Sequence, residues 1–287
     1  MVALDNVDFE VPEGITGLLG SNGAGKSTAI KLFFGLTDPT AGNALVLGKS
    51  ALSNPGVRER LGYMPEHDCL PGNVSAADFL THMAQVSGLP PSHARGRAAD
   101  TLRHVGLFEE RYRHIGGYST GMKQRVKLAQ ALVHDPVLVL LDEPTAGLDP
   151  GGRTEMLDLV RKTYRDFGIN VMLSSHLMGD VERVCDQIVV LELGKVAHQG
   201  AVTSFTEETL TVHVEVDSNR PEFIEALRAA GITPEFDGPS VVVQDATPEM
   251  LDIIRDAVVA SGARLRRMGP KRHALQELFS SPVESLG

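Results

Sequence analysis

The sequence has little cysteine and no long hydrophobic run, and these absences exclude several classes of protein. Two cysteines in 287 residues, Cys69 and Cys185, cannot build a disulfide framework and fit a reducing compartment. No apolar run approaches the roughly 20 residues that a membrane-spanning helix needs. Residues 1–10 have neither the basic start nor the apolar stretch of a signal peptide. The sequence therefore predicts a cytoplasmic chain that reaches a membrane only through a partner.

Positive charge is also scarce in this sequence. The 27 Lys and Arg residues stand against 37 Asp and Glu residues, which gives a net charge of −10. The portions before and after residue 204 are both acidic. Neither portion has the basic character of a nucleic-acid-binding domain, so no nucleic-acid partner is expected. The length is sufficient for two domains.

A glycine-rich segment, residues 20–27, matches the phosphate-binding pattern G-x-x-x-x-G-K-[ST] at every fixed position. An apolar strand is predicted before it and a helix after it, which is the context that this pattern requires. Glycines allow the backbone N–H groups to converge on phosphate oxygens, and the helix N-terminus adds its positive dipole. Lys26 can reach the β- and γ-phosphates of ATP, and the Ser27 hydroxyl can bind Mg²⁺. The residues predicted to hold the nucleotide here are Gly20, Asn22, Gly23, Ala24, Gly25, Lys26, Ser27 and Thr28.

A second pattern places two carboxylates at the end of a buried strand. Residues 137–141 form a continuous apolar run, typical of a parallel strand that is covered on both faces. Asp142 and Glu143 follow at its carboxyl end, the edge at which open α/β sheets bind ligands. Asp142 can hold Mg²⁺, and Glu143 can act as the general base on an attacking water. The alternative is that both are solvated acids at the end of a buried strand.

Two further segments give these patterns a family resemblance. Residues 144–150 read Pro-Thr-Ala-Gly-Leu-Asp-Pro, and residues 118–122 read Tyr-Ser-Thr-Gly-Met before a predicted helix. With the phosphate loop, they resemble the nucleotide-binding domain of ABC transporters, up to about residue 200. The resemblance implies an α/β P-loop NTPase domain over residues 1–204, with a helical subdomain at about residues 67–135. Three positions depart from the usual family signature Leu-Ser-Gly-Gly-Gln: Tyr118, Thr120 and Met122.

The same resemblance implies roles for residues outside the phosphate loop. Ser119 and Gly121 would contact the γ-phosphate of ATP held by a different subunit, and Asp149 matches the aspartate of the family's D-loop. His176 matches the switch histidine of the family. Glu66 stands where the family usually has glutamine. It could bind Mg²⁺ or hold water, and it adds a negative charge near the γ-phosphate.

The resemblance also implies partners. The chain contains one phosphate loop and one signature, so it needs a second ATPase subunit, expected to be an identical copy.

Residues 205–287 read as a βαββαβ ferredoxin-like domain. Its end, residues 273–279, is similar to ATPases of daunorubicin-resistance exporters, which pair with a separate integral-membrane permease. The resemblance thus implies a subunit that hydrolyses ATP and powers export, located on the inner face of the plasma membrane. The alternatives are a soluble ABC-type ATPase that acts on nucleic acid or ribosomes, and a nucleotide sensor with little turnover.

The remaining patterns predict further elements. Ser75 and Asp78 read as an N-cap pair at the start of a long helical pattern, broken at Pro90. Helices are predicted over residues 55–61, 75–110, 123–133 and 150–167. Strands are predicted over residues 4–11, 43–47 and 170–173, with a hairpin over 187–198.

The start of the sequence carries one more expectation. In the family, an edge strand and an aromatic residue that stacks on adenine precede the segment equivalent to residues 3–7. Here the sequence begins just before that segment. We therefore expect that the reading frame starts late or that the chain is truncated, with weak binding of adenine and poor selectivity for ATP over GTP.

Overall fold

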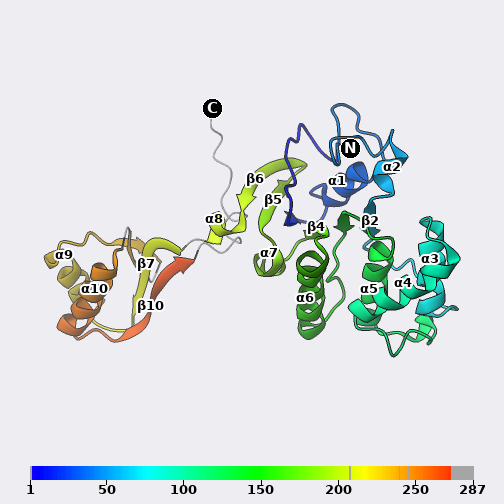
Figure 1. Cartoon of the computed structure of the whole chain (residues 1–287). Helices are drawn as coiled ribbons and strands as arrows, with labels where there is room; N and C mark the ends of the chain where they lie inside the picture. The colour runs from blue at the N-terminus through cyan, green and yellow to red at the C-terminus, as the bar shows by residue number, and fades with distance from the viewer. Residues whose placement is uncertain (1, 207, 239, 245, 273–287) are drawn as a thin grey trace. The chain divides into compact units, whose positions relative to one another are not determined.

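The computed structural model describes residues 2–206, 208–238, 240–244 and 246–272, and the chain divides into two compact units. The first unit ends at Val202 and the second begins at Thr203 (Figure 1). The composition of the sequence places the boundary after Ser204. None of the helices in the described ranges combines the length and the apolar composition needed to cross a bilayer.

The first unit is built on a six-stranded sheet with the order β2-β3-β4-β1-β5-β6. The first five strands in that order are parallel, and β6 pairs with β5 in the antiparallel direction. The strands are β1 (Ile15–Leu19), β2 (Leu61–Met64), β3 (Leu138–Leu141), β4 (Asn170–Ser175), β5 (Gln187–Glu192) and β6 (Lys195–Ala201). Every residue of β1 is buried, as expected for a parallel strand between two layers of helices. The predicted α/β fold is therefore confirmed.

Helices surround this sheet and also form a separate group beside β2. The helices of this unit are α1 (Lys26–Phe33), α2 (Pro55–Arg58), α3 (Ala76–Val86), α4 (Pro91–His104), α5 (Thr120–Leu132), α6 (Pro150–Phe167) and α7 (Met178–Val184), with a 3₁₀ turn at Ile115–Gly117. The short helix α8 (Val202–Thr206) spans the boundary between the two units. Helices α3, α4 and α5 gather on the β2 side of the sheet (Figure 1). The predicted cap is confirmed, because the Asp78 N–H donates to Ser75 Oγ at 3.1 Å.

Several predicted boundaries were wrong. Helix α4 ends at His104 rather than at residue 110, and α5 begins at Thr120 because Ser119 caps it. Strand β2 and helix α7 were not predicted. Both are short, so neither shows a full period of apolar residues.

The strands predicted over residues 4–11 and 43–47 do not form. A strand needs a neighbour to take up its backbone hydrogen bonds, and alternation of apolar residues does not provide one. Asp5 N–H donates to Gly194 O at 2.7 Å, and Val46 makes one isolated bridge with Lys49. Positive φ angles at Asn6 (50°) and Leu47 (53°) also interrupt the extended conformation.

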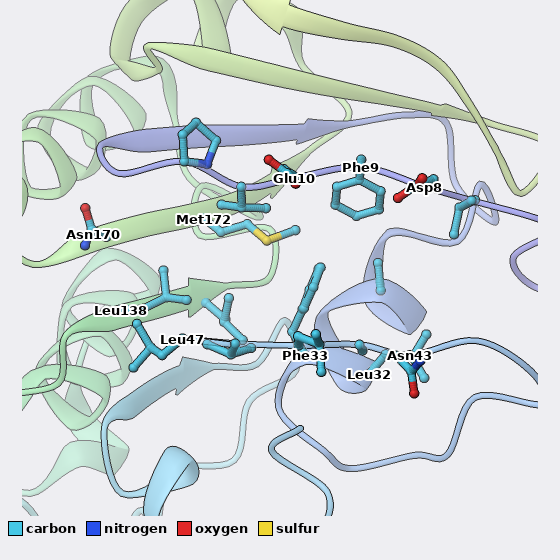
Figure 2. Close-up of a pocket in the computed structure, with 18 of the residues that line it drawn as sticks. Asp8, Phe9, Glu10, Leu32, Phe33, Asn43, Leu47, Leu138, Asn170 and Met172 are labelled. Carbon is cyan, nitrogen blue, oxygen red and sulfur yellow. The ribbon is translucent and has the colours of Figure 1, made fainter. Parts of the chain in front are cut away.

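These two segments instead line opposite sides of a cavity of about 530 Å³ (Figure 2). Phe9 lies on one side of it, and Phe33 and Leu47 lie on the other. Leu138 and Met172 of the sheet contribute further apolar surface.

The second unit is an antiparallel sheet with two helices. Its elements are β7 (Glu208–Val216), α9 (Arg220–Ala229), β8 (Glu235–Asp237), β9 (Ser240–Val243), α10 (Pro248–Ser261) and β10 (Leu265–Arg272). The sheet order is β10-β7-β9-β8, which is the split βαβ arrangement of ferredoxin-like domains. Val214, Phe223 and Ile254 are fully buried between the sheet and the helices. Residues 273–279, which carry the similarity to ATPases of daunorubicin-resistance exporters, lie outside the described residues.

Candidate active site

The phosphate loop connects buried strand β1 to the start of α1. Gly23 and Gly25 have φ angles of 85° and 106°, which side chains other than glycine rarely adopt. A Cβ atom on Gly25 would lie only 2.5 Å from Leu4 Cδ2, so this position also needs glycine for space. The loop and the first turn of α1 leave backbone N–H groups available for an anion.

Lys26 lies folded over this loop. Its side chain is only 6% exposed, and Nζ donates to Gly20 O at 2.7 Å and to Ser21 O at 3.2 Å. Nζ also lies 3.5 Å from Glu143 Oε1. The ammonium group is therefore positioned between the loop and the second carboxylate of the predicted site.

Two hydroxyl groups meet the Asp142 carboxylate. Ser27 Oγ donates to Asp142 Oδ1 at 3.2 Å, and Ser174 Oγ donates to the same oxygen at 2.7 Å. Ser174 Oγ also accepts the N–H of Glu143 at 2.9 Å. Hydroxyl and carboxylate oxygens are ligands that Mg²⁺ prefers, so Ser27 and Asp142 fit a magnesium site. Sequence reasoning gave Ser174 no role, although it stands two residues before His176 at the end of a buried strand.

Glu143 has an unusual backbone conformation and one carboxylate oxygen without a hydrogen bond from the described residues. Its φ angle is 47°, an uncommon value for a residue other than glycine. Oε2 lies 2.9 Å from His176 Nδ1. Oε1 is buried and accepts no hydrogen bond from any of the described residues. A buried carboxylate oxygen of this kind can accept a proton from a water molecule beside the phosphate loop.

The structure brings most of the predicted residues around one cavity of about 370 Å³. The Gly20 backbone oxygen accepts a hydrogen bond from the Lys26 ammonium, and Ala24 is buried. Asp142 accepts a hydrogen bond from Ser27, which lines the cavity. The predicted residues that line the cavity are Asn22, Gly23, Gly25, Lys26, Ser27, Thr28, Glu66, Glu143 and His176. The cavity thus combines anion-binding N–H groups, an ammonium, a magnesium-type oxygen pair and a candidate base.

Two titratable groups beside this cavity are shifted. Burial raises the pKa of Tyr63 to about 12, and the Asp142 carboxylate acts in the same direction. Burial lowers the pKa of Lys127, whereas the nearby Cys69, Asp68, Glu66 and Asp142 act in the opposite direction. The carboxylates of Asp68, Glu66 and Asp142 therefore favour the charged form of Lys127.

Comparisons with known proteins agree with this geometry. The family model described as "ABC transporter" matches residues 4–146. The chain is 30% identical over 303 residues to the doxorubicin resistance ATP-binding protein DrrA of Mycobacterium tuberculosis, a match that covers 100% of this chain and 91% of the relative. This chain belongs to the ABC transporter ATP-binding proteins.

Other relatives of this ABC ATPase have different roles. It is 33% identical over 284 residues to the methionine import ATP-binding protein MetN of Caulobacter vibrioides, covering 96% of this chain and 83% of the relative. The structure of cbiO1 from Clostridium perfringens, part of the ABC transporter complex cbiONQ, matches with a TM-score of 0.65 and 31% identity. That match covers 70% of this chain and 83% of that chain. The predicted resemblance, the P-loop fold and ATP hydrolysis as the activity are therefore confirmed.

Besides Gly20, Ala24 and Asp142, three more predicted residues of the ABC ATPase do not line the cavity. Ser119 Oγ accepts the N–H of Met122 at 3.3 Å and caps α5, which also carries Gly121. Asp149 Oδ1 accepts the N–H of Gly152 at 2.7 Å and caps α6. In a single chain these side chains serve as helix caps, and their contact with a second subunit stays a prediction.

Ser174 provides a direct test of the site geometry. We expect Ser174→Ala to lower the kcat of ATP hydrolysis by about 5- to 150-fold, the equivalent of losing a buried hydrogen-bond partner worth about 1–3 kcal/mol. The reason is that both Asp142 and the strained Glu143 lose their shared partner. Steady-state phosphate release over a range of Mg²⁺ concentrations measures the effect. Ser175→Ala on the same strand is the matched control, and wild-type kcat in the Ser174 variant would contradict the assignment.

Proposed function

We propose that this ABC ATPase powers the export of a substrate through a separate membrane permease. The observation that carries the proposal is the match to the doxorubicin resistance ATP-binding protein, which extends over the whole chain, second unit included. The methionine import relative covers almost as much of the chain, so the direction of transport has to be measured. The proposed location is the inner face of the plasma membrane, where the permease would hold the ATPase.

The proposed chemistry begins with the phosphates of ATP. The N–H groups of the loop and the Lys26 ammonium bind and orient them. Ser27 and Asp142 would hold Mg²⁺, and Glu66, which also lines the cavity, is a further candidate ligand. When bound there, the metal ion would neutralise charge on the phosphate oxygens.

The proposed hydrolytic step uses Glu143 Oε1, the carboxylate oxygen that accepts no hydrogen bond from the described residues. A water oxygen forms a bond to the γ-phosphorus while the bond from that phosphorus to the β–γ bridging oxygen breaks. Glu143 Oε1 takes the proton that the water loses, and ADP and phosphate are the products. His176 holds Glu143 through its 2.9 Å contact with Oε2 and keeps Oε1 directed toward the loop.

The proposed active unit is a pair of identical chains. Each chain has one phosphate loop, while Ser119 and Gly121 lie outside its own nucleotide cavity. A second copy would bring its α5 N-terminus, a natural anion-binding site, to the γ-phosphate, and Asp149 would lie in the same interface. ATP would thus close the pair, and release of the products would open it.

Purification of the tagged chain from native membranes tests the transport role. We expect an integral-membrane permease to co-purify and to raise the rate of ATP hydrolysis. In vesicles with the ATPase on the outside, an exporter should concentrate a fluorescent probe such as doxorubicin inside when ATP is added. Recovery of the chain only with ribosomes or DNA would favour the soluble alternative. Nucleotide binding with no turnover, even with the permease, would favour a sensor.

A further inference from the structure

Lys127 on α5 is a buried ammonium with an unusual partner. Its side chain is 3% exposed, and Nζ donates to the backbone oxygen of Glu66 at 2.8 Å. None of the ion pairs found within the described ranges includes Lys127. A buried charge without a direct counterion is destabilising, so this arrangement calls for a functional explanation.

The surroundings of Lys127 are acidic and belong to the nucleotide cavity. Glu66 lines that cavity, and its charge and that of Asp142 both favour the charged form of the lysine. One turn earlier on the same helix face, Lys123 pairs with Asp68 at 3.0 Å, but that pair is exposed. Helix α5 therefore directs two ammonium groups at residues 66–68, and only Lys127 is buried beside the cavity.

Glu66 presents an electrostatic problem for ATP. Glu66 lines the space that receives the phosphates and is solvent-exposed, and a negative charge at this position repels a triphosphate. The repulsion is greater for a triphosphate than for a diphosphate if the γ-phosphate lies on this side of the cavity, as the proposed function requires. Lys127 holds the same residue by its backbone and supplies one positive charge.

We propose that Lys127 is a positioning residue whose charge compensates the Glu66 carboxylate and so allows this site to bind a triphosphate. The inference rests on the proposed function through the placement of the γ-phosphate. The competing explanation is purely structural: Lys127 anchors residue 66 through its hydrogen bond, and its charge has no role. Lys127→Gln separates the two, because the amide keeps a hydrogen-bond donor and removes the charge.

The experiment is a cycle of wild type, Lys127→Gln, Glu66→Gln and the double variant. The affinities for adenylyl-imidodiphosphate, a triphosphate that is not hydrolysed, and for ADP are measured with Mg²⁺. We expect Lys127→Gln to weaken triphosphate binding about tenfold and ADP binding by less than about twofold, within the range of coupling between neighbouring residues. The double variant should bind the triphosphate within about twofold of Glu66→Gln. Lys123→Gln, which breaks the exposed pair on the same helix, is the matched control and should change neither affinity by more than about twofold.

Each outcome decides the matter. Triphosphate affinity equal to wild type in Lys127→Gln, equal losses for both nucleotides, or no recovery in the double variant would overturn the proposal. Thermal unfolding checks that each variant folds. If the Lys127→Gln single variant does not fold but the double variant with Glu66→Gln does, charge compensation is supported. If neither the Lys127→Gln variant nor the double variant folds, Lys127 has a structural role. Failure of the proposed function is distinguishable, because the wild-type chain would then show no nucleotide binding that depends on Lys26.

Discussion

Glu143→Gln is expected to lower the turnover of ATP by about 10²–10⁴, the usual effect of losing a general base. The amide has the same shape as the carboxylate and keeps the contact with His176 available, but it cannot accept a proton from water. In the structure the carboxylate is buried, with Oε2 at 2.9 Å from His176 Nδ1 and with Oε1 at 3.5 Å from Lys26 Nζ but accepting no hydrogen bond from the described residues. Binding of ATP should persist, because the phosphate loop and Lys26 are unchanged.

Phosphate release and nucleotide affinity, measured on the same preparation, test this expectation. ATP-dependent dimers should also accumulate in size-exclusion chromatography, because hydrolysis no longer separates the two chains. Glu155→Gln is a matched control, since Glu155 forms an exposed ion pair with Arg125 at 2.6 Å, away from the cavity. Wild-type turnover in Glu143→Gln would reject Glu143 as the base.

The phosphate loop could be predicted from sequence because its geometry is local. Gly23, Gly25 and Lys26 lie within a few residues of one another, and their backbone and side-chain requirements are encoded in that short segment. The same holds for the cap at Ser75 and for the buried run of β3. Glu66 and His176 also line the cavity. They are distant from the loop in sequence, and only the family resemblance, not a local pattern, assigned them to the same site.

Ser174 could not be predicted because its role depends on strand register. Leu141 of β3 lies opposite Leu173 of β4, so the next residues, Asp142 and Ser174, fall side by side. Nothing in either segment alone gives this register. The buried position of Lys127 is similar, because it depends on how α5 packs against residues 66–68.

The strands expected near the start of the chain show that a local pattern can predict an element that does not form. Residues 4–11 and 43–47 have an apolar alternation that suits a strand, but β-structure is a property of pairs. The described contacts leave these segments apart, on two sides of an apolar cavity (Figure 2). In the second unit the predicted strands do form, because each of them pairs with an antiparallel neighbour.

Mixing two inactive variants is expected to restore ATP hydrolysis. Lys26→Ala removes the ammonium of the phosphate loop, and Ser119→Arg places a bulky cation at the α5 N-terminus. Each variant alone should be nearly inactive, because both composite sites of its dimer are damaged. A mixed dimer combines the intact loop of one chain with the intact Ser119 of the other. One of its two symmetric sites is then whole, and such dimers should recover about half of the wild-type rate if the sites act independently.

The result depends on where Ser119 lies. Its hydroxyl caps α5 and does not line the cavity of its own chain, so action within one chain would require a rearrangement of α5. Two affinity tags on the two variants allow purification of verified heterodimers before phosphate release is measured. Ser119→Ala removes the capping hydroxyl without adding bulk or charge and serves as the control for loss of the cap, which by itself costs about 1 kcal/mol of stability. Heterodimers that fold, bind ATP and still show no hydrolysis would place Ser119 outside the partner's active site, and the proposed pair of composite sites would have to be abandoned.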